Sequence, residues 1–259
     1  MNRSTTAQWS LAVLLLAAAL AGCGGDSGPD ESDQSGETGA DGPGAAEPQP
    51  NGIMDVTGAR AARLAEQATR ALDDVVYEGR HTILQPEGEF EGRGRITITD
   101  QHTCEWRLSL DDLGRVTARV AEGRTYLRAR PEVWRELVGL PDDVVTSIKG
   151  KWLALPEEER PVSDCYAEMW GTSANVSTCF EGVETGEVDG VPARIVQCAA
   201  SGSGTHKLYI SAVDEPVVLR RVGIDDDMPF DMRLVDSETG VTIEPPPEKD
   251  IAEGPSVPA

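Results

Sequence analysis

The feature that most limits the fold is a series of short segments in which apolar and polar residues alternate. Ile96 and Ile98 alternate with arginine and threonine, and the same period of two returns in residues 105–110 and 115–120. Such a period places every second side chain on one face of a strand. Further strands are predicted at 193–198, 206–211, 216–222 and 230–235. The chain is therefore predicted to be rich in strands that each have one apolar and one polar face.

The breaks between these segments are short and contain turn-forming residues, as at residues 112–114 and 122–123. Tight turns join antiparallel neighbours, and no long helices separate the strands, which excludes a doubly wound parallel fold. An open sheet of this size curls. We therefore expect an α+β, β-rich fold built on one curled antiparallel sheet, a half-barrel of about ten strands.

The apolar side of such a sheet must be covered. Residues 58–76 have apolar residues at helical spacing, with Thr57 or Asp55 as the cap, and short helices are expected after Pro131 and Pro141. We expect the N-terminal helix and these short central helices to cover the concave side. Trp134 and Trp152 flank the short helices and either close a cavity mouth or pack beneath them.

These helices are few for so wide a face, which predicts a space that an apolar ligand can enter. The alternative is that the same residues form an ordinary filled core. The residues expected to line the space are Ile96, Ile98, Trp106, Leu108, Leu110, Val116, Val120, Leu208, Ile210, Phe230, Met232 and Leu234.

The N-terminal region has the pattern of an export signal. Residues 11–20 are uninterrupted apolar residues, too few to cross a bilayer but typical of a secretory signal. Residues 20–23, Leu-Ala-Gly-Cys, resemble a bacterial lipobox. The resemblance implies a lipoprotein signal peptide at 1–22 and diacylglycerol on Cys23, which would anchor the chain at the extracytoplasmic face of the cell membrane. The alternatives are an ordinary signal peptide cleaved near Gly22 or an uncleaved anchor.

Composition divides the rest of the chain. Residues 23–55 are rich in Gly, Pro, Ser and acids, which predicts a disordered acidic tether. Residues 56–248 suit one domain. Residues 249–259 are predicted to be a disordered tail, with fraying after Pro247.

The formal net charge of −22 argues against a nucleic-acid partner, because such a protein must neutralise phosphates with Lys and Arg. It also argues against electrostatic adhesion to anionic lipid. The tie to the membrane is therefore expected to be the acyl chains on Cys23. No protein partner is indicated.

Four cysteines remain, and an even number in an exported chain predicts two disulfides, for which three pairings exist. Asp189-Gly190 is a hairpin turn signal, so residues whose numbers sum to 379 should face each other. Cys179 and Cys198 sum to 377, which favours that pair and leaves Cys104 with Cys165 to join a strand to a helix. A zinc site is the alternative, but no CxxC pair is present.

The sequence contains no catalytic constellation. His81, His102 and His206 are isolated, and the serines of residues 201–206 lie in a glycine-rich hairpin rather than in a strand-to-helix nucleophile turn. We therefore predict a protein that is not an enzyme and has no cofactor and no metal site.

Four segments occur in order after the lipobox: "EGRTYLRARPEVWREL", "KGKWLALP", "EVDGVPARIV" and "KLYISAVDEPVVLRR". Together they resemble the actinobacterial LppX, LprA, LprF and LprG lipoproteins of the wider LolA/LolB-like superfamily, over about residues 56–248. The resemblance implies a half-barrel closed by helices, with a cavity for the acyl chains of envelope lipids, and a Cys104–Cys165 pair as in some relatives. It implies a lipoprotein that binds or carries a lipid; the alternative is a non-catalytic cell-surface interaction module with a filled core.

Overall fold

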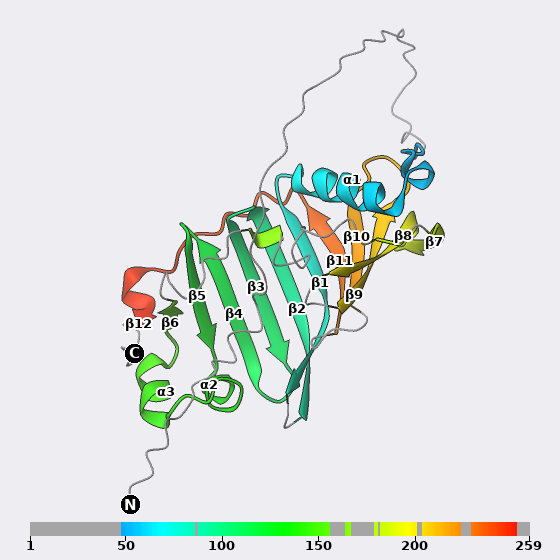
Figure 1. Cartoon of the computed structure of the whole chain (residues 1–259). Helices are drawn as coiled ribbons and strands as arrows, with labels where there is room; N and C mark the ends of the chain where they lie inside the picture. The colour runs from blue at the N-terminus through cyan, green and yellow to red at the C-terminus, as the bar shows by residue number, and fades with distance from the viewer. Residues whose placement is uncertain are drawn as a thin grey trace, which may run out of the picture.

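The computed structural model describes residues 48–85, 88–155, 164–166, 179–180, 182–200, 204–223 and 229–252. In these residues one large sheet has twelve strands in the order β12-β6-β5-β4-β3-β2-β1-β11-β10-β9-β8-β7 (Figure 1). Neighbouring strands are antiparallel except β12, which runs parallel to β6. The predicted curled antiparallel sheet is therefore confirmed, with two strands more than expected.

The sheet consists of two meanders that meet where β1 pairs with β11. The first meander contains β1 (Val75–Gln85), β2 (Gly88–Asp100), β3 (Thr103–Leu110), β4 (Gly114–Ala121), β5 (Arg124–Ala129) and β6 (Trp152–Ala154). The second contains β7 (Glu184–Val188), β8 (Val191–Ala200), β9 (Gly204–Ser211), β10 (Val218–Gly223) and β11 (Phe230–Ser237). Neither β6 nor the two-residue strand β12 (Ile251–Ala252) is long enough to show a period of two in the sequence.

Helix α1 (Gly58–Arg70) begins as predicted, with the Thr57 side chain accepting a hydrogen bond from the Arg60 N–H at 3.3 Å. The predicted extension of this helix to Val76 is wrong, because Val75 and Val76 are the first residues of β1. Both valines are fully buried, and β-branched side chains suit a pleated sheet better than a helix. Packing within the sheet therefore overrides the helical spacing.

Helix α1 lies across β8, β9 and β10 (Figure 1). Its buried face consists of small residues, among them Ala61 and Ala65, which allow a close approach to Val196, Ile210 and Val218. Thr69 fixes the far end of the helix, because its hydroxyl oxygen accepts the Val218 N–H at 3.0 Å.

The short helices α2 (Pro131–Glu136) and α3 (Asp142–Ile148) cover the opposite end of the same sheet face. Pro131 occupies the first turn of α2, as predicted. Their buried side chains, Val133, Trp134, Val145 and Ile148, form one cluster with Leu110 and Ala129.

Both predicted domain boundaries need correction. Residues 48–55, assigned to the tether, include the 3-10 helix η2 (Ile53–Asp55), in which Ile53 is buried under α1. Residues 249–252, assigned to the tail, lie in the 3-10 helix η5 (Glu248–Asp250) and in β12, and Ala252 is buried. In each case a buried apolar side chain, Ile53 or Ala252, holds a polar segment against the domain. Residues 251–252 also pair with β6. The predictions for residues 1–22, for Cys23 and for residues 253–259 lie outside the described residues.

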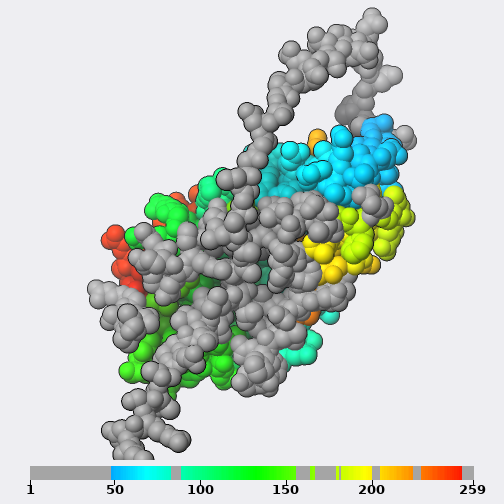
Figure 2. Space-filling model, viewed as in Figure 1, coloured from blue at the N-terminus to red at the C-terminus, as the bar shows by residue number. Residues whose placement is uncertain are grey.

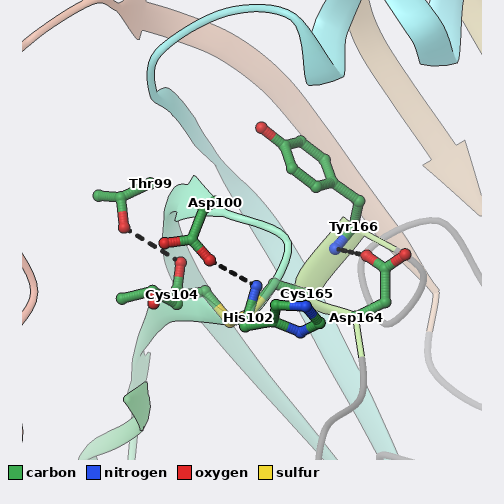
Figure 3. The surroundings of a disulfide bond; sticks show 8 residues. Thr99, Asp100, His102, Cys104, Asp164, Cys165 and Tyr166 are labelled. Atoms are coloured by element: carbon green, nitrogen blue, oxygen red, sulfur yellow. Dashed lines mark hydrogen bonds between the residues drawn. A yellow bond between two sulfur atoms is a disulfide. The ribbon is translucent and has the colours of Figure 1, made fainter. Parts of the chain in front are cut away.

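Both predicted disulfides are present. Cys179 and Cys198 face each other in an isolated bridge beyond the β7–β8 hairpin, whose turn pairs Val188 with Val191 as the Asp189-Gly190 signal requires. Cys104 of β3 is bonded to Cys165, and so ties the sheet to a helical turn that contains Tyr166 (Figure 3).

Candidate functional site

Strand register places all twelve predicted ligand-lining residues on one face of the sheet. In antiparallel pairs, residues directly opposite share a face. Ile96 lies opposite both Tyr77 and Trp106, and Tyr77 lies opposite Leu234. The other nine residues follow from the same pairings through β2, β3, β4, β9, β10 and β11. We call this side the apolar face.

Three covers lie on the apolar face. Helix α1 packs over Val196 and Ile210, and helices α2 and α3 pack near Leu110. The turn held by the Cys104–Cys165 disulfide packs between them, next to Val120. Figure 2 shows α1 (blue to cyan) and α2–α3 (green) at opposite ends of the molecule.

Burial divides the twelve residues into two equal groups. Six are core residues with at most 5% of their surface exposed: Ile96, Ile98, Leu110, Val120, Ile210 and Met232. The other six are only half-buried: Trp106, Leu108, Val116, Leu208, Phe230 and Leu234. The first group fits the filled-core alternative, whereas the second group is the part of the apolar face that retains accessible surface.

Two glycines lie opposite each other in the middle of the apolar face. Gly79 of β1 lies directly opposite Gly94 of β2, so this pair presents no side chain to the covers. A Cβ at Gly79 would lie 1.8 Å from the backbone oxygen of Asp231, and a Cβ at Gly94 would lie 2.6 Å from the His81 ring. The chain therefore uses glycine where strands and the His81 ring approach most closely.

A polar cluster lies beside these glycines, on the otherwise apolar face. Arg221 of β10 is buried, its Nη2 lies 3.2 Å from Nε2 of His206, and its guanidinium stands 4.6 Å from the centre of the Phe230 ring. His206 and His81 both lie near that ring, at 5.6 and 6.1 Å between centroids. The cluster places one positive charge among aromatic and aliphatic side chains.

Both histidines are held neutral. Burial, and secondarily the charge of Arg221, lowers the pKa of His206 to about 3. The same two causes lower the pKa of His81 to about 4. At neutral pH the two imidazoles are therefore polar but uncharged neighbours of the Arg221 guanidinium.

Sequence reasoning treated His81 and His206 as isolated and did not identify Arg221. A signal was present: Arg220 and Arg221 are consecutive in a strand, so one of them must point to the apolar face. Arg194, fully buried beneath η2, was also missed. It donates from Nη1 to the carbonyl oxygens of Ile53 and Val56, both at 2.6 Å, and so fastens the N-terminal segment to β8.

A cleft of about 370 Å³ opens at the rim of the sheet, beside the loop that follows α1. Its lining is mostly apolar and includes Leu72, Pro192, Val213, Val217 and Leu234. Leu234 is the one residue of the predicted set that lines this cleft.

Two other possibilities find no support in the described part of the chain. No three His, Cys, Asp or Glu side chains there are placed to hold a metal ion. Among the same residues, no helix has the length and hydropathy required to cross a bilayer.

Neither a protein-family model nor a curated protein matches the chain in sequence. Solved structures do match it. LprF from Mycobacterium bovis is 14% identical with a TM-score of 0.48, over 76% of this chain and 99% of that chain. The lipoprotein LppX from Mycobacterium tuberculosis is 12% identical with a TM-score of 0.44, over 72% and 98%. A LolA superfamily protein from Nitrosomonas europaea is 9% identical with a TM-score of 0.31, over 75% and 96%. The structure is thus similar to members of the two groups that the sequence motifs resemble.

Proposed function

We propose that this protein is an envelope lipoprotein that binds or carries a lipid or another apolar ligand on the apolar face of its sheet. The observation that supports this most is the half-buried group of six, Trp106, Leu108, Val116, Leu208, Phe230 and Leu234. They lie on one sheet face. Apolar surface that stays accessible together on one face is typical of a site that takes an apolar ligand.

The mechanism we propose is passive. Acyl chains leave the membrane for the apolar face because apolar surface is removed from water, at about 25 cal/mol per Å². A diacylglycerol on Cys23 would keep the domain at the membrane from which the ligand comes.

The test is native mass spectrometry of the chain from residue 24 onward, which contains every described element and lacks the acylated cysteine. We expect co-purified lipid, and a Leu108→Trp variant should retain at least tenfold less because the larger ring fills the binding surface. Ser109→Trp is the matched control, since the adjacent side chain points to the opposite face. Absence of co-purified lipid, together with no uptake of an added fluorescent phospholipid, would favour an interaction module with a filled core.

A further inference from the structure

The side of the sheet opposite the apolar face carries two adjacent cross-strand rows that consist mainly of arginine. The row from β10 to β5 contains Arg220, Arg233, Glu78, Arg95, Arg107, Thr117 and Arg128. The row from β11 to β4 contains Asp231, Arg80, Arg93, Ser109 and Arg115. We call these twelve positions the arginine rows. They hold eight arginines and two carboxylates in a chain whose formal net charge is −22.

Three pairs of arginines within the rows lie directly opposite each other on neighbouring strands: Arg80 with Arg93, Arg95 with Arg107, and Arg220 with Arg233. Like charges in this position destabilise a sheet. Stability alone would place opposite charges across each pair. In two of these pairs each arginine is matched by a carboxylate, whereas Arg80 and Arg93 stay opposed with no ion pair among the described residues. An opposed pair left in this state is more typical of a functional surface.

Ion pairs neutralise only part of the patch. Four of the eight arginines are paired: Arg95 with Glu78, Arg107 with Glu105 at 2.5 Å, Arg220 with Asp231 at 2.5 Å, and Arg233 with Asp189 at 3.3 Å. Within the described residues, Arg80, Arg93 and Arg115 make no ion pair, and all three side chains are exposed. Much of the acidic charge lies in another part of the sequence, with seven acids and no basic residue in 24–47 alone.

The composition of the rows identifies the kind of partner. Protein interfaces also use Arg, but they centre on a desolvated core with apolar or aromatic anchors, and single-stranded nucleic acids stack on aromatic rings. The twelve positions contain neither; Tyr209 lies directly opposite Arg220 at the end of the first row, and its ring centre is already covered by the Arg220 guanidinium at 5.1 Å. The neighbouring Trp152 ring is buried, with the guanidinium groups of Arg119 and Arg128 at 4.9 and 4.5 Å from its centre. What the face offers is an array of guanidinium groups, which bind phosphate in a bidentate manner.

We propose that the arginine rows dock the domain onto an anionic phospholipid membrane, with this face against the headgroups. Each basic residue held near such a surface strengthens binding, and a broad array without an apolar centre suits a surface of many phosphates. The inference does not depend on the proposed lipid cargo, which concerns the opposite face. It also revises the expectation drawn from net charge, because an average over the chain conceals a basic face.

The experiment is co-sedimentation of the chain from residue 24 onward, without acyl chains, with vesicles of equal parts phosphatidylglycerol and phosphatidylcholine. Pure phosphatidylcholine vesicles are the comparison. We expect binding to the anionic vesicles only, and loss of that binding in 0.5 M salt because screening shortens the reach of exposed charges.

Two variants with the same change in net charge locate the surface. Arg80→Gln/Arg93→Gln removes an opposed pair from the rows and should weaken binding to the anionic vesicles about tenfold or more. Arg60→Gln/Arg63→Gln removes two exposed arginines from α1, on the other side of the sheet, and should change it less than twofold. Thermal unfolding should show that both variants are folded, with Arg80→Gln/Arg93→Gln slightly more stable than the parent because it removes an opposed pair of like charges.

Several outcomes overturn the proposal: no binding to either vesicle, equal binding to both, or an equal loss in the two variants. Binding to polyglutamate or single-stranded DNA without binding to anionic vesicles would assign the rows to an anionic macromolecule instead, and would also overturn it. None of these results would affect the lipid-binding test on the apolar face.

Discussion

The two faces of the sheet are built from the same strands but have opposite physical properties. In β3, Leu108 and Leu110 point to the covers, whereas Arg107 and Ser109 point away from them. The first pair belongs to a surface of aliphatic and aromatic residues, and the second belongs to the arginine rows. Moving one residue along the strand therefore replaces apolar surface with positive charge.

The difference shows what an average over a chain conceals. The formal charge of −22 is correct for the whole sequence, yet it says nothing about a face whose members lie on seven strands, spaced two apart on five of them. The overall composition likewise does not reveal that apolar residues gather on one face. Each face is visible only when the period of two is combined with strand register.

The largest effect that separates the two faces is expected from introducing one charge on each side of β3. Leu110→Asp places a carboxylate at a position with 1% exposure, among the residues beneath α2 and α3, and should lower the free energy of unfolding by about 5 kcal/mol. Chemical denaturation followed by circular dichroism measures the change.

Ser109→Asp is the control for this prediction. Its carboxylate would lie between Arg93 and Arg115, so the variant should be as stable as the parent or slightly more stable, by up to about 0.5 kcal/mol. Equal destabilisation by the two substitutions would mean that the faces are not distinct in the way described here.

Local periodicity explains why much of the fold was predictable. Alternation fixes which side of a strand a residue occupies without knowledge of its partners, so all twelve residues predicted to share a face do so. A hairpin turn then fixes register, which is why the Cys179–Cys198 pair followed from Asp189-Gly190.

Properties that depend on distant packing were not predictable. Leu110 and Leu108 have the same pattern in the sequence, yet Leu110 is buried by α2 and α3 and Leu108 is only half-buried. The end of α1 and the strand β12 also depend on pairing with segments far away in the chain. The same alternation also predicts that the arginines of the rows share one face. The net charge of −22 instead indicated an acidic surface.

The next largest effect concerns the cover on the apolar face. Cys104→Ala/Cys165→Ala removes a disulfide between residues 61 apart in sequence. In the chain-entropy model this lowers the free energy of unfolding by about 4 kcal/mol. Because Cys165 and Tyr166 pack on the apolar face, the variant should also bind more of a dye that reports exposed apolar surface. Binding to anionic vesicles should stay unchanged, since the arginine rows lie on the other side. A variant with parental stability would show that packing alone holds this cover in place.

The smallest of these effects is the pH dependence that the apolar face imposes through His206. Burial lowers the pKa of His206 to about 3 in the folded protein, whereas an unfolded histidine titrates near 6.5. Between these values the unfolded chain binds the extra proton, so stability falls as pH decreases below about 6.5, by about 2 kcal/mol at pH 5.

His206→Gln should therefore lose about 2 kcal/mol less than the parent between pH 7.5 and 5.0 in denaturant titrations. His102→Gln alters an exposed histidine and should leave the pH dependence unchanged. An identical decrease in the parent and in His206→Gln would show that the His206 ring is accessible to protons, and that the apolar face is wetter around Arg221 than its burial indicates.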